Sequence, residues 1–167
     1  MKRLATVGVA AVAAAMIGPW TARAQMPKVE GYDGYTFGMT VEQARHVKPA
    51  VPYDACDFKD VVGCIKYPVT ISAFPAVVAV QFKGSPAKVV QIVVQFDSLR
   101  QPRAGKCKVV TAEVGRLLAA KYGPRPIVSR ATATWTSPAG GSVSLTALCV
   151  DDDIGINAVA YQPSSTL

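Results

Sequence analysis

The sequence predicts an α+β fold in which a mainly antiparallel sheet carries two helices on one face. Three observations favour this class. The segment at residues 105–124 has a helical period, two groups of segments with alternating apolar and polar residues flank it, and each group keeps its apolar residues on a single side. One-sided strands and one-sided helices bury their apolar sides against each other, so we expect both helices on the same face of the sheet.

The chain opens with the pattern of an export signal at residues 1–24. Two cations are followed by an apolar run at residues 4–17 and by the small-x-small site Ala22-Arg23-Ala24. The run is shorter than a membrane-spanning helix and no later segment qualifies, so we expect cleavage near Ala24 and no membrane span. The first cysteine is Cys56, which argues against a lipoprotein signal. The predicted location is the periplasm, or outside the cell.

Composition excludes one class of partner. Removing Lys2, Arg3 and Arg23 lowers the formal charge of +7 by three, to +4. The remaining cations are scattered along the chain, without the dense cluster or interleaved aromatic residues of a nucleic-acid surface. No nucleic-acid partner is therefore expected.

The first half of the predicted domain begins with an irregular lead-in at residues 25–36, in which Tyr32 and Tyr35 are candidate core anchors. A short helix follows, started by the capping-box spacing of Thr40 and Gln43 and ended by Pro49. Three strands come next. The sequence places them from Cys64 to Ser72, from Val77 to Lys83 and from Lys88 to Asp97, with Val90, Ile92, Val94 and Phe96 on one face of the third and Pro68 favouring a sheet edge for the first.

The second half repeats that order. In the long helix, an apolar stripe includes Cys107, and Gly123-Pro124 is a stop signal. The other residues of the stripe are Val110, Val114, Leu117, Leu118 and Tyr122. Three strands follow, over residues 130–136, 143–150 and 156–161. We therefore predict a single domain over residues 25–162, built from half-repeats of about residues 38–97 and 105–162, and a disordered tail at 163–167.

Four cysteines in an exported chain are expected to pair, and three connectivities exist. Cys107 points to the core from the helix, and Cys149 shares the parity of the buried residues of its strand. Cys56 and Cys64 are close enough in sequence to clip the loop between them. The favoured pairing is therefore Cys56–Cys64 with Cys107–Cys149. Metal binding by the four thiols is the alternative, but no CxxC spacing supports it and the expected compartment is oxidising.

No catalytic constellation is found in the sequence. His46 is the only histidine, and Glu42 and Glu113 are the only glutamates outside the lead-in. The run Asp151-Asp152-Asp153 lacks the ligand spacing of a calcium loop. No metal or cofactor is therefore expected.

Two surfaces remain as candidates for recognition. The segment clipped by Cys56 and Cys64 carries aromatic and acidic groups on a restrained loop, which lowers the entropy lost on docking. Its candidate residues are Tyr53, Asp54, Asp57, Phe58 and Asp60. The second surface is a hydroxyl-rich strand face formed by Thr132, Thr134, Thr136, Ser144 and Thr146. We expect the clipped segment to be the binding site.

Two short motifs carry a resemblance. The helix start Gly38-Met39-Thr40-Val41-Glu42-Gln43-Ala44 and the helix end Lys121-Tyr122-Gly123-Pro124, each followed by a β-meander, resemble the exported β-lactamase-inhibitor-protein-like fold, which the small outer-membrane assembly lipoproteins of the SmpA/OmlA type share. The chain departs from them in lacking a lipobox and a clear first helix pair. The resemblance implies binding without catalysis. The predicted function is a protein–protein adaptor or inhibitor whose partner is a protein or envelope component, and the alternative is an envelope-acting hydrolase.

Overall fold

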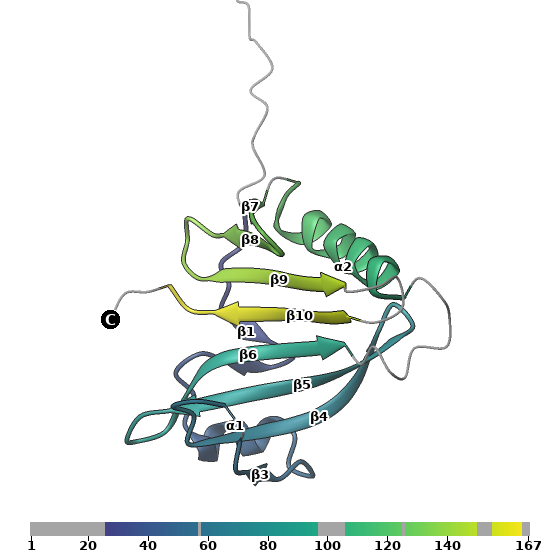
Figure 1. The fold of residues 1–167 in the computed structure, drawn as a ribbon. Coiled ribbons are helices and arrows are strands. Elements are labelled where there is room, and N and C mark those ends of the chain that lie inside the picture. The colour runs from purple at the N-terminus through teal and green to yellow at the C-terminus, as the bar shows by residue number, and fades with distance from the viewer. Residues whose placement is uncertain (1–25, 57, 97–105, 125, 150–154, 165–167) are drawn as a thin grey trace, which may run out of the picture.

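A computed structural model describes residues 26–56, 58–96, 106–124, 126–149 and 155–164, and confirms the α+β class (Figure 1). The two helices are α1 (Val41–Val47) and α2 (Lys106–Tyr122). The strands are β1 (Gly31–Tyr32), β2 (Tyr35–Thr36), β3 (Tyr53–Asp54), β4 (Gly63–Ile71), β5 (Phe74–Lys83), β6 (Lys88–Phe96), β7 (Ile127–Ser129), β8 (Thr132–Thr136), β9 (Ser142–Cys149) and β10 (Gly155–Gln162).

Eight of the strands form one antiparallel sheet in the order β3-β4-β5-β6-β10-β9-β8-β7. Each helix is followed by four strands that run from an edge of the sheet to its centre, and the two sets meet where Val94 of β6 lies opposite Val159 of β10. The prediction of three strands per half was incomplete. It lacked the edge strands β3 and β7, which have two and three residues and are too short to show an alternation.

Both helices cover one face of this sheet, here called the inner face. The register aligns a row of buried side chains across six strands, namely Ile65, Val80, Ile92, Tyr161, Val143 and Trp135. α2 packs on the β9–β10 end of this face and α1 near β4 (Figure 1). One correction concerns β6. A bulge shifts the register beside Phe82, so that Val89 is buried and Val90 is only half-buried.

The apolar stripe of α2 packs as its sequence period predicts. Cys107, Val110, Val114, Leu118 and Tyr122 are all buried, and Leu117 at the margin of the stripe is half-buried. At the end of the helix, Gly123 adopts a φ of 101°, and its carbonyl accepts a hydrogen bond of 2.8 Å from the indole nitrogen of Trp135. That bond joins the C-terminal end of α2 to β8. No helix in the described part of the chain is long and apolar enough to cross a membrane.

The short helix α1 has the predicted capping box. Thr40 Oγ1 accepts from the Gln43 amide at 3.3 Å, and Gln43 Oε1 accepts from the Thr40 amide at 2.9 Å. Ala44 of α1 is fully buried. A helix of seven residues is marginal alone, so its contacts with the sheet hold it in place.

The segment Met26–Met39, here called the N-terminal strap, joins the two halves of the sheet. The Val29 amide donates to Gly140, in the turn between β8 and β9, and the Gly38 amide donates to Val89 of β6. Between these points, Tyr32 packs on Tyr161 and Tyr35 stacks on Tyr67, with ring centroids 4.9 and 5.9 Å apart. Both tyrosines therefore anchor the lead-in to the core, as the sequence suggested.

Candidate functional site

The predicted disulfides are both present. Cys56 pairs with Cys64 and Cys107 with Cys149, with Cα–Cα distances of 5.5 and 5.6 Å, and no cysteine is free. The clipped segment consists of residues 53–63, and the first bridge joins Cys56 within this segment to Cys64, which directly follows it. Within it, the Val61 amide donates to the Phe58 carbonyl, and the Val62 amide donates to Phe82 of β5 at 2.9 Å. The segment is thus tied to the sheet by a covalent bond and by a backbone hydrogen bond.

Phe58 is presented to solvent at the edge of the sheet. Its side chain is 39% exposed, and the Lys66 ammonium lies 5.9 Å from its ring centroid. Lys66 alternates with the buried Ile65 and Tyr67 and is itself exposed, so it belongs to the opposite, outer face of the sheet. Phe58 therefore sits beside the outer face.

Tyr53 lies on the other side of the sheet. It pairs with Ile65, packs edge-on against Phe82 with centroids 5.3 Å apart, and carries the guanidinium of Arg45 5.7 Å above its ring. A Cβ at Gly63 would collide with the Tyr53 ring, so a larger residue there requires the ring to move. The structure does not bring the candidate residues Tyr53 and Phe58 together, because Tyr53 packs against the core on the inner face.

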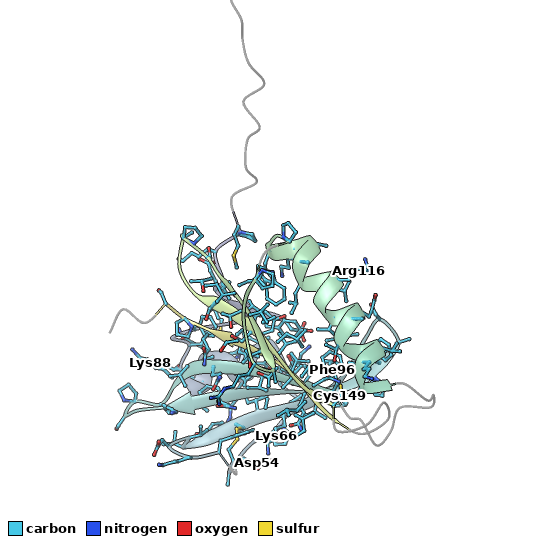
Figure 2. All side chains as sticks on the ribbon, turned by 45° about the horizontal axis from the view of Figure 1, so that its top comes forward. Asp54, Lys66, Lys88, Phe96, Arg116 and Cys149 are labelled. Atoms are coloured by element: carbon cyan, nitrogen blue, oxygen red, sulfur yellow. A yellow bond between two sulfur atoms is a disulfide. The ribbon has the colours of Figure 1, made fainter. Side chains whose placement is uncertain are left out.

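The acidic members of the clipped segment are placed as follows. Asp54 ends β3 opposite Cys64 and is exposed, and Asp60 is exposed in a turn with a φ of 62°. Asp57 lies outside the described residues. Figure 2 shows Asp54 and Lys66 at the same edge of the molecule. This edge therefore offers Phe58 together with carboxylates and an ammonium group.

The hydroxyl-rich surface belongs to the same outer face. The register aligns one row across six strands, from β4 to β8, made of Lys66, Ala79, Val93, Ala160, Ser144 and Thr134. The hydroxyls of Thr134 and Ser144 are 3.0 Å apart, and those of Thr132 and Thr146 are 3.1 Å apart. Lys66, which lies beside Phe58, and the hydroxyl-rich surface are therefore at opposite ends of one face, about 24 Å apart at the usual strand spacing. Both helices lie on the inner face.

The candidate catalytic groups lie apart from one another. His46 is exposed on α1, and Glu42 is exposed in its first turn. Glu113 accepts two hydrogen bonds of 2.8 Å from Arg116, and these bonds, with a smaller contribution from Ser72, lower the pKa of its carboxyl. Asp151, Asp152 and Asp153 lie outside the described residues. Among the residues that are described, no three histidine, cysteine or acidic side chains gather as a metal site.

A pocket that the sequence did not predict lies between the N-terminal strap and the end of α2. Its volume is about 440 Å³, and its lining includes Glu30, Asp33, Tyr32 and Tyr122. Glu30 pairs with Lys28 at 3.0 Å, and Asp33 pairs with Lys48 at 3.2 Å. The pocket forms only when the strap folds across the sheet, so local sequence patterns carry no signal for it.

Tyr35 lines this pocket, and Tyr67 and Tyr161 contact its lining residues Asp33 and Tyr32. The Tyr67 hydroxyl donates to Asp33 at 2.9 Å, and burial, this bond and the charge of Asp33 together raise the pKa of Tyr67. Burial also raises the pKa of Tyr161, with smaller contributions from Tyr122 and Tyr32. The Tyr35 hydroxyl is buried without a partner among the described residues. These phenols are held in their neutral form.

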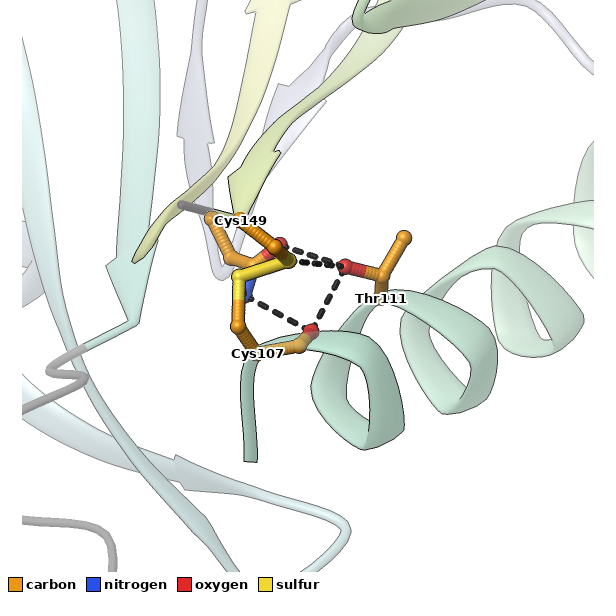
Figure 3. Close-up of a disulfide and its surroundings, with 4 residues drawn as sticks. Cys107, Thr111 and Cys149 are labelled. Carbon is orange, nitrogen blue, oxygen red and sulfur yellow. Dashed lines mark hydrogen bonds between the residues drawn. A yellow bond between two sulfur atoms is a disulfide. The ribbon is translucent and has the colours of Figure 1, made fainter. Parts of the chain in front are cut away.

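The second disulfide is embedded in a polar network (Figure 3). Asn157, 2% exposed on the inner face of β10, donates from its amide to the Cys107 carbonyl at 3.2 Å and to Cys107 Sγ at 3.5 Å. The Thr111 hydroxyl lies 2.7 Å from both Asn157 Oδ1 and the Cys107 carbonyl, and its single proton serves one of them at a time. The network satisfies polar groups at the first turn of α2, which gives it a structural role.

No family model matches the chain, and no curated protein or solved structure matches it either. The resemblance to the β-lactamase-inhibitor-protein-like fold therefore rests on the two sequence motifs and on the predicted order of elements.

Proposed function

We propose that the chain is an exported, non-catalytic binding module, a protein–protein adaptor or inhibitor, whose partner docks on the outer face of the sheet at the clipped segment. The observation that supports this most is Phe58, an aromatic side chain held 39% exposed by a loop that a disulfide and a backbone hydrogen bond restrain. Two disulfides also suit the oxidising compartment that an export signal implies.

The restraint explains why this aromatic residue is suited to binding. A free loop loses conformational entropy when a partner immobilises it, whereas the clipped loop has lost most of that freedom during folding. An exposed phenylalanine then contributes its apolar area at small cost, and buried aromatic anchors dominate the affinity of most protein interfaces. The complementary partner surface is an apolar pocket for Phe58.

The charges beside Phe58 define the rim of that pocket. Asp54 and Asp60 are exposed on the clipped segment, and Lys66 lies under the ring. A partner with cations around an apolar pocket for Phe58 can form ion pairs with the carboxylates of Asp54 and Asp60. Rim charges contribute more to the rate of association than to affinity, so binding is expected to weaken with salt through a slower association.

The direct test is affinity capture from the envelope fraction of the source organism with wild-type protein, Phe58→Ala and Val109→Ala. Val109 is a matched control, since it is 52% exposed on α2, which covers the inner face. We expect one captured partner to be lost from the Phe58→Ala sample, with a reduction in affinity of about 30-fold or more. Equal recovery on all three baits contradicts the proposed site.

One observation favours a second candidate, the envelope hydrolase. The pocket beside the N-terminal strap places Glu30 and Asp33 in one lining, and a pair of carboxyls is what glycoside hydrolysis requires. Glu30 is paired with Lys28 and Asp33 with Lys48, so each carboxylate is oriented toward a neighbouring lysine of the fold. Turnover of peptidoglycan that disappears in Asp33→Asn would establish the hydrolase, and the binding proposal predicts no turnover by the wild type.

A further inference from the structure

The edge of the sheet opposite the clipped segment is an exposed apolar strand. β7 pairs with β8 alone, and it lies at the end of the sheet beside the C-terminal end of α2 (Figure 1). Ile127 and Val128 are 70% and 69% exposed, the highest values among the large hydrophobic side chains of the described residues. Neither is buried by the fold, so folding alone does not account for two adjacent β-branched residues there.

The two edges of the sheet differ in how they are protected. At the first edge, Pro68 lacks an amide donor and Lys66 places a charge on β4, both of which discourage pairing with another strand. At the second edge, the unpaired side of β7 is bounded by Pro126 before the strand and by the turn at Arg130 after it. The backbone of Ile127–Ser129 between them remains available, with apolar rather than charged side chains.

The charged residues next to β7 along the chain are of one sign. From Val114 to Val150 the sequence contains four cations, Arg116, Lys121, Arg125 and Arg130, and no acidic residue. Arg116 is neutralised by Glu113, whereas Lys121 and Arg130 are exposed and make no ion pair with a described residue. Antiparallel pairing of two copies through β7 would bring these like charges together. The charge therefore disfavours a second copy and favours an acidic partner.

We propose that β7 is a docking edge for an extended acidic peptide, which adds to the sheet as a further strand. Backbone hydrogen bonds to Ile127–Ser129 supply the pairing, as in other cases of strand addition. Ile127 lies opposite Thr134 of the outer face, and Val128 lies opposite Ala133 of the inner face. In an added strand, one peptide side chain lies beside Ile127 on the outer face and its neighbour in sequence lies beside Val128 on the inner face. The peptide that fits therefore has apolar residues at its centre and carboxylates at its ends.

The site is tested with a random dodecapeptide display library selected on the intact, oxidised protein. A parallel selection uses the double variant Ile127→Thr with Val128→Thr, which keeps β-branching and removes the apolar surface. Val109→Thr serves as an exposed apolar control on α2. The substituted side chains are exposed, so unchanged melting temperatures and intact disulfides are expected for all three proteins.

We expect selection on the wild type and on Val109→Thr to enrich peptides with β-branched or aromatic centres flanked by aspartate or glutamate. These peptides should bind the double variant at least about tenfold more weakly, and Arg130→Glu should reverse their preference toward lysine-flanked peptides. The proposal is overturned if no peptide is enriched, if enriched peptides bind the double variant equally, or if they carry no acidic excess. It is also overturned if sedimentation shows a wild-type dimer that the double variant abolishes.

Discussion

The two disulfides should differ in their contribution to stability, and the difference follows from the lengths of chain they close. Cys107 and Cys149 are separated by 42 positions, whereas Cys56 and Cys64 are separated by 8. On the chain-entropy model, the long bridge contributes about 4 kcal/mol and the short one about 2.5 kcal/mol to the free energy of unfolding. Replacing both cysteines of a pair by alanine is the perturbation, because it leaves no unpaired thiol.

The surroundings of the Cys107–Cys149 bridge further increase the stability that is lost when this bridge is removed. Removing Cys107 Sγ takes one acceptor from the buried Asn157 amide and leaves a gap at a side chain that is 1% exposed. We therefore expect the Cys107→Ala/Cys149→Ala protein to be less stable than the Cys56→Ala/Cys64→Ala protein by about 1.5 kcal/mol or more. Urea unfolding followed by circular dichroism measures both, provided that the m-values agree. Equal stabilities, or a less stable Cys56→Ala/Cys64→Ala protein, would refute this reasoning.

Three further predictions concern side chains on the inner face and at the clip. Tyr53→Ala should cost about 3 kcal/mol in urea unfolding, whereas Phe58→Ala should cost under about 1 kcal/mol, because only Tyr53 packs on the core; similar costs would contradict their placement on opposite faces. Asn157→Ala should cost about 1–3 kcal/mol by leaving buried partners unpaired, and a neutral result would exclude the network in Figure 3. Burial raises the pKa of Tyr67 and Tyr161 in the folded state, so the stability they contribute is retained below the unfolded pKa of about 10 and is lost as the pH rises above it. In the double variant Tyr67→Phe with Tyr161→Phe, the melting temperature should therefore fall less steeply with rising pH. An unchanged slope of melting temperature against pH would count against this explanation.

Much of the fold could be predicted from local periodicity. The helical period placed the buried stripe of α2, and strand parity placed Cys107 and Cys149 on one face, which gave the correct disulfide. The same parity predicted the buried rows of β4, β5 and β9. These features were accessible because burial repeats along each element, so several residues report the same orientation.

The rest depends on contacts between distant segments. β7 is three residues long, and its edge position is set by pairing with β8. The bulge beside Val90 arises from register against β5, and the tyrosine-lined pocket arises from the N-terminal strap lying over the sheet. Tyr53 and Phe58 are candidate binding residues of one short segment, yet pairing with Ile65 turns Tyr53 to the inner face. No local pattern contains this information.

We propose that a partner binds this protein at Phe58. Site-specific photo-crosslinking in the source organism tests it directly, with benzoylphenylalanine at position 58, which keeps an aromatic side chain, and at position 109 as an exposed control. We expect one covalent adduct that forms from position 58 and is absent from position 109. No adduct from position 58, or the same adducts from both positions, would contradict it.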